Sequence, residues 1–448
     1  MHPNTCALHS SSSRVCIAVL IGLVVSLCPW PGLAGEHSLV DMLSWDFGGQ
    51  VRTTGTLQHT EYDGLSGEEG RETFQDLSLE TRLMGDLRIG SNLDFTAHYQ
   101  AWMETGDWTR MEMETASPLL SSLQTLFPGS SGADSLPFLD LTKAVSRHKD
   151  TRIVHRLDRF KLSLNRPWGR LSLGRQTLTL GNGLIFNPMD IFNPFSPTAF
   201  LRDYKIGEDM ALAQIFLDSG HDLRFFHLSR REPESRDVSW NRSSTGANGH
   251  FFVRRTEMNV LFARHYKDLI LGLGLSSTLG MAAWRFDLTW TELDQDSDHG
   301  GFVSAVANLD RSWVWWNKNW YGLIEIFYSG IGKSDLSSVL ASKPLLERIR
   351  RGELFVLGKS YLAGLIRFEA HPLMNLSGTA IVSMADGSWL FQPKATWNLA
   401  QNVDLLLGAT LAHGPADSDF GGFDVQLGPQ EVSLAPPNTV TLWLTAYF

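Results

Sequence analysis

After residue 43 the chain alternates hydrophobic and polar residues with a period of two. Successive side chains of an extended strand point to opposite faces, so this period predicts strands with one hydrophobic and one polar face. The segments are roughly ten residues long, a typical length for a strand that crosses a bilayer. The pattern therefore predicts an all-β protein of many antiparallel strands. The clearest segments are 93–104, 282–291, 391–399, 403–411 and 439–448.

Short links between these segments mostly alternate with longer ones, as in an up-and-down sheet with tight turns at one end and loops at the other. The short links lie at 90–92, 167–169, 219–221, 317–319, 371–372 and 401–402. The longer ones lie at 61–70, 107–150, 183–203, 232–249, 294–300, 333–352 and 414–437. We count eighteen strands if 249–255 and 257–266 are two strands, and sixteen is the alternative. The turn between those two contains no Gly or Pro.

Two of the long loops contain hydrophobic residues at helical spacing, which predicts short helices there. Packing against the rim of the sheet is the simpler role for them, and gating or solute capture is the other. The first loop has Leu119, Leu120, Leu123, Leu126 and Phe127, then Phe138, Leu139, Leu141 and Val145. The second has Leu336, Val339 and Leu340, then Leu345, Leu346 and Ile349.

The first 35 residues are typical of a cleaved secretory signal peptide. Arg14 precedes an uncharged run at 15–27, which is too short for a transmembrane helix of roughly 20 residues. A small-residue stretch then predicts cleavage after Ala34 or Gly35. All three cysteines lie in this segment, and Cys28 would suit a lipoprotein except that bulky Leu27 precedes it. The mature chain, 36–448, is therefore predicted to be an exported, thiol-free single domain.

Period-two strands alone fit either a soluble sandwich or a barrel that faces lipid. Later stretches never reach about 18 consecutive apolar residues, so membrane-spanning helices are not expected. A barrel needs hydrophobic residues only at alternate positions. The formal net charge of −10 argues against nucleic acid as a partner. The chain has 15 Trp, and several near strand ends suit the aromatic belts at membrane interfaces: Trp45, Trp102, Trp168, Trp290, Trp320, Trp389 and Trp443.

The last strand ends on Phe448, with Leu442 and Leu444 on the same face. This ending resembles the closing strand and assembly signal of Gram-negative outer-membrane β-barrels. The resemblance implies a transmembrane antiparallel β-barrel in the outer membrane, with short periplasmic turns and long outer loops. It also implies contact with outer-membrane lipid and lipopolysaccharide, and with periplasmic chaperones and the barrel-assembly machinery.

Residues 174–209 depart from the alternation. Three prolines within 188–197 remove backbone donors, so this stretch cannot be a ladder strand in lipid and must lie at an aqueous end or fold inside. The Gly-Arg-Gln strand at 174–176, the Gly-Asn-Gly bend at 181–183 and the Asn-Pro-rich loop at 187–197 resemble uncharacterised porin-like proteins. They also resemble, distantly, the alginate-export family of eighteen-stranded barrels.

This resemblance implies a channel whose loop folds toward the lumen and narrows it. The implied constriction residues are Arg175, Asp190, Arg202, Asp203 and Asp209. The alternative is structural: Asp190 and Asp203 cap turns and pair with Arg175 or Arg202 to hold the loop in place.

Charges elsewhere on the polar faces have mixed signs and nearly balance. Those that we expect to line the lumen include Arg82, Lys161, Arg285, Asp287, Glu325, Arg367 and Lys394. Alginate exporters are associated with a strongly basic lumen, and steering of a polyanion needs charge of a single sign. Alginate itself is therefore doubtful, and a conduit for small solutes or for a neutral polymer fits as well.

Three functions remain open from the sequence. The first is a porin-like channel for passive or semi-selective passage of small solutes, with a polysaccharide-export barrel as its variant. The second is an enzyme on the same barrel, but no His lies in a recognisable motif with Ser or Asp, so we predict no catalysis, metal or cofactor. The third is a plugged structural or adhesion barrel.

Overall fold

The computed structural model of the protein describes residues 43–59, 73–114, 136–148, 150–199, 204–294, 300–333, 338–339, 341–427, 430–434 and 436–448. Residues 44–448 form one compact unit. The predicted signal peptide lies outside the described residues, as do Arg202, Asp203 and the segment 119–127.

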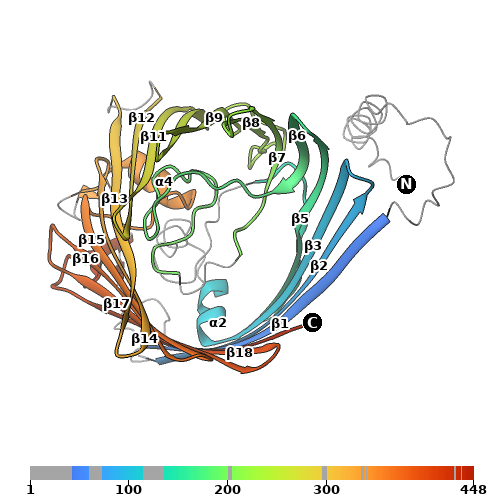
Figure 1. Ribbon diagram of the computed structural model, residues 1–448. Helices are drawn as coiled ribbons and strands as arrows, with labels where there is room; N and C mark the ends of the chain where they lie inside the picture. Colours follow the sequence, from blue (N-terminus) through green and yellow to red (C-terminus); the bar gives the residue numbers. More distant parts are fainter. Residues whose placement is uncertain are drawn as a thin grey trace, which may run out of the picture. The chain divides into compact units, whose positions relative to one another are not determined.

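Eighteen antiparallel strands of the described part form one closed barrel (Figure 1). Each strand pairs with its neighbours in the chain, and β21 pairs with both β18 and β1, which closes the sheet. The count of eighteen, rather than sixteen, is confirmed. The strands are β1 (Leu43–His59), β2 (Thr73–Ile89), β3 (Leu93–Gly106), β5 (Thr151–Arg166), β6 (Gly169–Gln176), β7 (Glu208–Phe216), β8 (Asp222–Leu228), β9 (Ser244–Val253), β10 (Thr256–His265), β11 (Asp268–Leu279), β12 (Ala282–Glu292), β13 (Phe302–Trp315), β14 (Lys318–Ser329), β15 (Ser360–His371), β16 (Met374–Ser383), β17 (Trp389–Ala400), β18 (Val403–His413) and β21 (Asn438–Tyr447).

The turn without Gly or Pro joins β9 and β10. Its residues are Arg254 and Arg255, and Arg254 takes a positive φ of 58° without being Gly or Asn. The ladder pairs Thr256 with Val253, so only two residues form the turn. The prediction of two separate strands here is confirmed, although β9 begins at Ser244 rather than at residue 249.

The loops carry a few elements of their own: α2 (Asp107–Glu114), β4 (Thr142–His148), α4 (Lys343–Arg350) and the hairpin β19 (Phe423–Leu427) with β20 (Gln430–Leu434). The start of α2 is held by Asp76 of β2, whose carboxylate accepts hydrogen bonds from the backbone N–H groups of Trp108 and Thr109. In α4, Leu345 and Ile349 are fully buried, as the helical spacing predicts. None of the helices in the described part is long and apolar enough to cross a bilayer.

The helix predicted from Phe138, Leu139, Leu141 and Val145 is wrong, because this stretch leads into strand β4. The physical reason lies in the neighbouring strands. β6 pairs with β5 only between Phe160 and Arg166, which leaves the outer end of β5 with an open edge. β4 fills that edge by pairing with residues 151–156 of β5. Backbone hydrogen bonding to a free edge outweighs the local helical spacing.

The hydrophobic faces of the strands point out of the barrel. On β21, Val440, Leu442 and Leu444 are 45–48% exposed, whereas Thr441 and Thr445 are 6% and 5% exposed. The same holds on other strands, since Leu288 and Trp290 of β12 are exposed while Asp287 and Thr289 are buried. A soluble sandwich would bury the hydrophobic faces instead. The observed orientation is that of a barrel whose outer surface faces lipid.

Two of the tryptophans assigned to the aromatic belts face the interior instead. Trp102 shares the inner face of β3 with buried Gln100, and Trp443 shares that of β21 with Thr441. Each packs against an arginine: the guanidinium of Arg156 lies 5.0 Å from the ring centroid of Trp102, and that of Arg52 lies 5.4 Å from Trp443. The belt prediction is wrong for these two residues, because a cation–π contact inside the barrel is an alternative use of Trp.

Candidate pore constriction

The segment between β6 and β7 runs through the interior of the barrel (Figure 1). We call residues 177–207 the luminal segment; 177–199 and 204–207 of it are described, and they contain no strand. It reaches residues on β12, β14 and β17, far from its own strands in the sequence. The expectation that this proline-rich stretch folds inside agrees with this geometry.

Two carboxylates hold the middle of the luminal segment. Asp287 of β12 accepts hydrogen bonds from the backbone N–H groups of Asn182 (2.6 Å) and Gly183 (3.0 Å). Glu325 of β14 accepts from the next three, 184–186, and the shortest of these bonds, to the N–H of residue 186, is 2.6 Å. A backbone without a ladder must find other partners when it is buried. Five consecutive donors find them here on the barrel wall.

Asp287 and Glu325 were predicted to line the lumen, and both lie on the inner face. Their exposed fractions are 0% and 1%, however, because the luminal segment covers them. Their side chains hold the loop rather than face open solvent. The alternation along a strand predicts the face to which a side chain points, but it does not predict which other segment of the chain will cover that side chain.

The luminal segment also packs into two hydrophobic clusters. On one side, Met189 and Phe192 pack with inward-facing residues of β7–β11, which include Met210, Phe226 and Leu261. On the other side, Ile185 and Phe186 pack with residues of β13–β17. The ring of Phe186 stacks on Phe327 at a centroid distance of 4.5 Å. The luminal segment thus forms a packed core with inward-facing residues of strands between β7 and β17.

The sequence did contain a signal for this core. β8 reads Asp-Leu-Arg-Phe-Phe-His-Leu, with Phe225 exposed on the outside and Phe226 buried on the inside. A strand with hydrophobic residues on both faces is usually buried on both. Runs of this kind on β8, β10 and β11 could have identified the wall on which the loop rests.

Asp190, a predicted constriction residue, forms a buried ion pair with Lys205, with 2.5 Å between Oδ1 and Nζ. Lys205 also donates to the carbonyl of Leu178 at 2.8 Å. Burial raises the pKa of Asp190 to about 6, and the Lys205 ammonium opposes that rise. This ion pair links two parts of the luminal segment that lie 15 positions apart in the chain. Sequence reasoning proposed Arg175 or Arg202 as the partner and missed Lys205.

Arg175 and Asp209, two further predicted constriction residues, bind each other. Arg175 donates from Nε to Oδ1 (2.8 Å) and from Nη2 to Oδ2 (2.9 Å), and both side chains are 4% exposed. The pair also holds Leu139 of the preceding loop, whose N–H and carbonyl bond to Asp209 and Arg175 at 2.6 Å each. Gly174, at a φ of +116°, has no room for a Cβ because the carbonyl of Phe160 would lie 2.1 Å away. The Gly-Arg-Gln strand therefore holds Leu139 of the preceding loop against β6 and β7.

An arginine-rich wall faces the other side of the luminal segment. We call the inner-face residues Arg52, Arg82, Arg156 and Arg159 the arginine wall; they lie on β1, β2 and β5 with the carboxylates of Glu80 and Asp158. Among the described residues, these four guanidinium groups pair with two carboxylates, so the described part of this group is net positive. Arg52, Arg156 and Arg159 keep 11–19% of their side chains exposed.

Tyr204 of the luminal segment packs against this wall. Its ring centroid lies 3.4 Å from the guanidinium carbon of Arg82 and 4.7 Å from that of Arg159. Burial raises the pKa of the Tyr204 phenol, although the two arginines oppose the rise. The phenol therefore stays neutral at ordinary pH. Sequence reasoning identified Arg82 but not Tyr204, Arg52 or Arg156.

The remaining predicted lumen residues also lie on inner faces. Lys161 lines a cavity of about 530 Å³ at the β2–β3 and β5–β6 turn end of the barrel, together with Asp86, Asp94 and Arg170. The other three residues are spread along the wall: Arg285 pairs with Asp310, Arg367 lies 5.3 Å from the ring of Tyr321, and Lys394 shares a face with buried Gln392.

Within the described ranges, no group of three His, Cys, Asp or Glu side chains is arranged to hold a metal ion.

Comparisons with known proteins give a match at the level of structure. No family model and no curated protein matches the chain. A BenF-like porin from Pseudomonas fluorescens Pf-5 aligns over 90% of this chain and 99% of its own, at 8% identity and a TM-score of 0.50. The fold is that of an outer-membrane porin.

Two further structures align at slightly lower scores. OccAB1 of Acinetobacter baumannii is 7% identical, with 90% of this chain and 96% of its own covered and a TM-score of 0.49. Wzi of Escherichia coli, an outer-membrane protein involved in group 1 capsule assembly and described as a carbohydrate-binding β-barrel, is 9% identical, with 99% and 90% covered and a TM-score of 0.49.

Proposed function

We propose that this porin-like barrel is an outer-membrane channel for passive or semi-selective passage of small solutes. After removal of a signal peptide, the mature chain spans the outer membrane of a Gram-negative bacterium, in contact with lipid and lipopolysaccharide. The observation that carries the proposal is the division of the interior. The luminal segment packs with inward-facing residues of strands between β7 and β17 and contacts the arginine wall through Tyr204, while Arg52, Arg156 and Arg159 of that wall stay partly exposed.

The charge of that wall supports a preference for anions. Fixed positive charge in a narrow, low-dielectric passage raises the local concentration of anions and lowers that of cations. The rest of the inner face nearly balances, so the preference is set where the luminal segment narrows the route. Of the predicted constriction residues, the described three, Arg175, Asp190 and Asp209, form internal ion pairs, and we propose that they support the narrowing rather than contact the solute.

Ion selectivity tests the proposal. The reversal potential of a bilayer that holds many channels is measured in a KCl gradient, for the wild type and for the double variant Arg52→Gln/Arg156→Gln. We expect anion preference in the wild type and a severalfold lower anion-to-cation permeability ratio in the variant. Arg255→Gln, an exposed arginine in the β9–β10 turn, is the matched control and leaves the ratio unchanged.

An absence of any ionic current over a wide voltage range would contradict the proposal and favour a plugged structural barrel. Currents without anion preference would retain the channel but reject the role of the arginine wall.

A further inference from the structure

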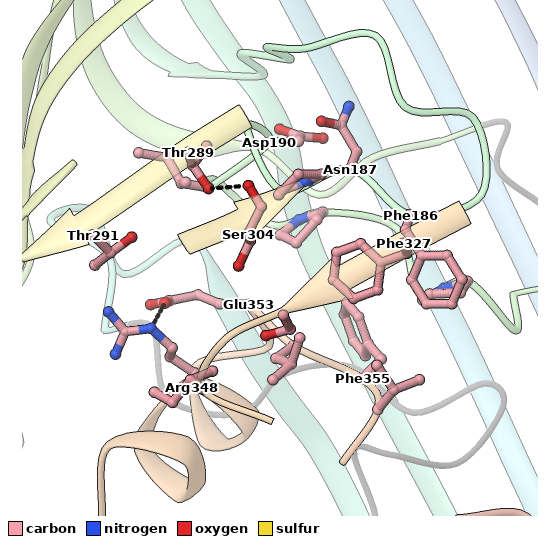
Figure 2. A pocket seen from close by; sticks show the side chains of 18 of the residues that line it. Phe186, Asn187, Asp190, Thr289, Thr291, Ser304, Phe327, Arg348, Glu353 and Phe355 are labelled. Atoms are coloured by element: carbon pink, nitrogen blue, oxygen red, sulfur yellow. Dashed lines mark hydrogen bonds and ion pairs between the residues drawn. The ribbon is translucent and has the colours of Figure 1, made fainter. Parts of the chain in front are cut away.

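The luminal segment leaves little room for a solute on the side of β12–β14. A pocket lies there between the segment and the wall, and Figure 2 shows Phe186, Phe327 and Phe355 around it. It offers about 80 Å³ to the centres of water-sized molecules. At roughly 10–15 Å³ per water, this is room for several waters, so the pocket cannot carry a larger solute.

On the arginine wall, one of the four arginines is covered. Arg82 has 4% of its side chain exposed, whereas Arg52 and Arg156 keep 11% and 19%. The guanidinium carbon of Arg82 lies 3.4 Å from the ring centroid of Tyr204, which is van der Waals contact. Arg52 and Arg156 lie 5.4 and 5.0 Å from tryptophan ring centroids, and these rings leave them partly open.

The edge of the Arg82 guanidinium is occupied as well. Nη2 binds Glu80 at 3.2 Å, and Nη1 binds Asp158 at 3.5 Å. Nε is buried and has no hydrogen-bond partner among the described residues. An accessible arginine binds oxyanions through its Nε and Nη groups, so Arg82 would be a further anion contact if the Tyr204 ring were absent.

Side chains of β2 and β3 hold the Tyr204 ring in this position. The phenol hydroxyl is hydrogen-bonded to Nδ1 of His98, and Nε2 of the same imidazole lies 3.5 Å from the carboxylate of Asp86. Asp86 in turn accepts a hydrogen bond of 2.5 Å from the hydroxyl of Thr96. The ring is therefore fixed by the same wall that it covers.

The backbone after Tyr204 is also held against the wall. Arg159 donates from Nη2 to the carbonyl of Lys205 at 2.5 Å, and the N–H of Gly207 donates to Asp158 at 3.4 Å. A Cβ on Gly207 would lie 2.4 Å from the carbonyl oxygen of Asp158, so only Gly allows this close approach. The stretch 204–207 therefore lies directly against β5, with the Tyr204 ring over Arg82.

We propose that Tyr204 determines the anion selectivity of the passage by shielding Arg82. With the ring in place, anions contact Arg52 and Arg156, and Arg82 is withdrawn from the passage. The effect on ions rests on the proposed channel, but the shielding itself is measurable without any current.

Chemical modification of arginine tests the shielding. The detergent-solubilised protein, residues 36–448, is treated with phenylglyoxal, and modified peptides are quantified by mass spectrometry. We expect Arg82 to react severalfold more slowly than Arg156 in the wild type, and Tyr204→Ala to raise the rate at Arg82 severalfold. Tyr204→Phe, which keeps the ring and loses only the hydrogen bond to His98, should leave Arg82 slow.

The matched control is Tyr328→Ala, which removes an outward-facing ring of β14 that is 43% exposed. It should leave the reaction rate of Arg82 at the wild-type value. Heat-modifiable mobility on gels shows that each variant is folded. Equal rates at Arg82 and Arg156 in the wild type, or no change at Arg82 in Tyr204→Ala, would overturn the shielding and the proposal with it.

Reversal potentials in a KCl gradient test the role in selectivity. Arg82→Gln is combined with Tyr204→Ala and, separately, with Tyr204→Phe. We expect Arg82→Gln to lower the anion-to-cation permeability ratio severalfold in the Ala background, where Arg82 is exposed, and only slightly in the Phe background. Equal effects in the two backgrounds would show that the ring does not control access to Arg82.

Failure of the channel and failure of the shielding are distinguishable. An absence of current in every variant would reject the proposed channel and, with it, the role of Tyr204 in selectivity. The labelling pattern would still show whether Tyr204 shields Arg82, because it is measured without a membrane.

Discussion

At the scale of single residues, inward-facing carboxylates of this barrel have different roles that their sequence positions do not reveal. Period-two parity correctly places Asp287 and Glu325 on the inner face. Their partners could not be predicted, because Leu184 is 141 positions from Glu325 in the chain and no local pattern links the two. The same holds for Asp190, whose partner Lys205 follows 15 positions later in a segment without periodicity.

Glu325→Gln tests the role of this carboxylate in holding the luminal segment. Three backbone donors then share a single neutral carbonyl oxygen, and hydrogen bonds to charged groups contribute roughly 1.5–3 kcal/mol each. We expect a free energy of unfolding that is lower by about 2 kcal/mol, together with noisier single-channel currents. Glu369→Gln, whose carboxylate accepts an exposed hydrogen bond from Asn319, is the control. Identical urea unfolding curves for the two variants would show that Glu325 does not hold the segment.

The Asp190–Lys205 pair predicts a pH dependence. The pKa of Asp190 is about 6 in the folded protein against an ordinary value of 3.8, so the folded state favours its protonated form. The contribution of this group to stability is therefore complete below about pH 3.8 and is lost as the pH rises through 6. We expect the difference in unfolding free energy between wild type and Asp190→Asn to change between pH 4 and pH 7, with the wild type losing stability relative to the variant. Parallel unfolding profiles over that range would contradict this assignment.

At the scale of elements, the sequence predicts the strands better than the loops. Alternation and turn residues give the eighteen strands, and three prolines show that the luminal segment cannot join the ladder. That segment rests on inward-facing hydrophobic residues of β7–β11. Alternation alone assigns these positions to the polar face, so it does not predict where the segment packs. The helix expected near Leu139 failed for a related reason, since the open edge of β5 is a tertiary feature.

The closing strand carries a prediction about assembly. Phe448 bonds through its backbone N–H and carbonyl to Gly49 of β1, at 3.0 and 2.9 Å, and its side chain is 58% exposed. We propose that Phe448, Leu444 and Leu442 are read by the barrel-assembly machinery before the barrel closes. Phe448→Ala should lower the amount of heat-modifiable protein in the outer membrane severalfold, while refolding in detergent stays near wild type. Trp397→Ala, another exposed outward aromatic, is the control.

Equal losses of folded protein in cells and in detergent would show that Phe448 contributes only to stability. Equal yields of both variants in cells would show that the terminal residue is not a signal.

At the scale of the whole molecule, the account depends on one orientation: hydrophobic faces toward lipid and polar faces toward an aqueous interior. The exposed outer residues and the buried inner ones support it across the described strands. The interior is itself divided, because the luminal segment packs with strands between β7 and β17, whereas part of the arginine wall on β1, β2 and β5 stays exposed. The predicted signal peptide and the predicted thiol-free mature chain fit this architecture, but neither of them reveals the division.

The most direct test uses residues 36–448, the predicted mature chain, as a cysteine-free background, since all three native cysteines lie in 1–35. Single cysteines at Thr56 and Leu57, adjacent positions on β1, are labelled with a fluorophore after reconstitution into liposomes. The account predicts that lipid-borne quenchers dim the label at Leu57, which is 45% exposed, and leave the label at Thr56 bright, while a water-soluble quencher gives the reverse. Equal quenching at both positions, or the opposite pattern, would contradict the orientation and with it the channel.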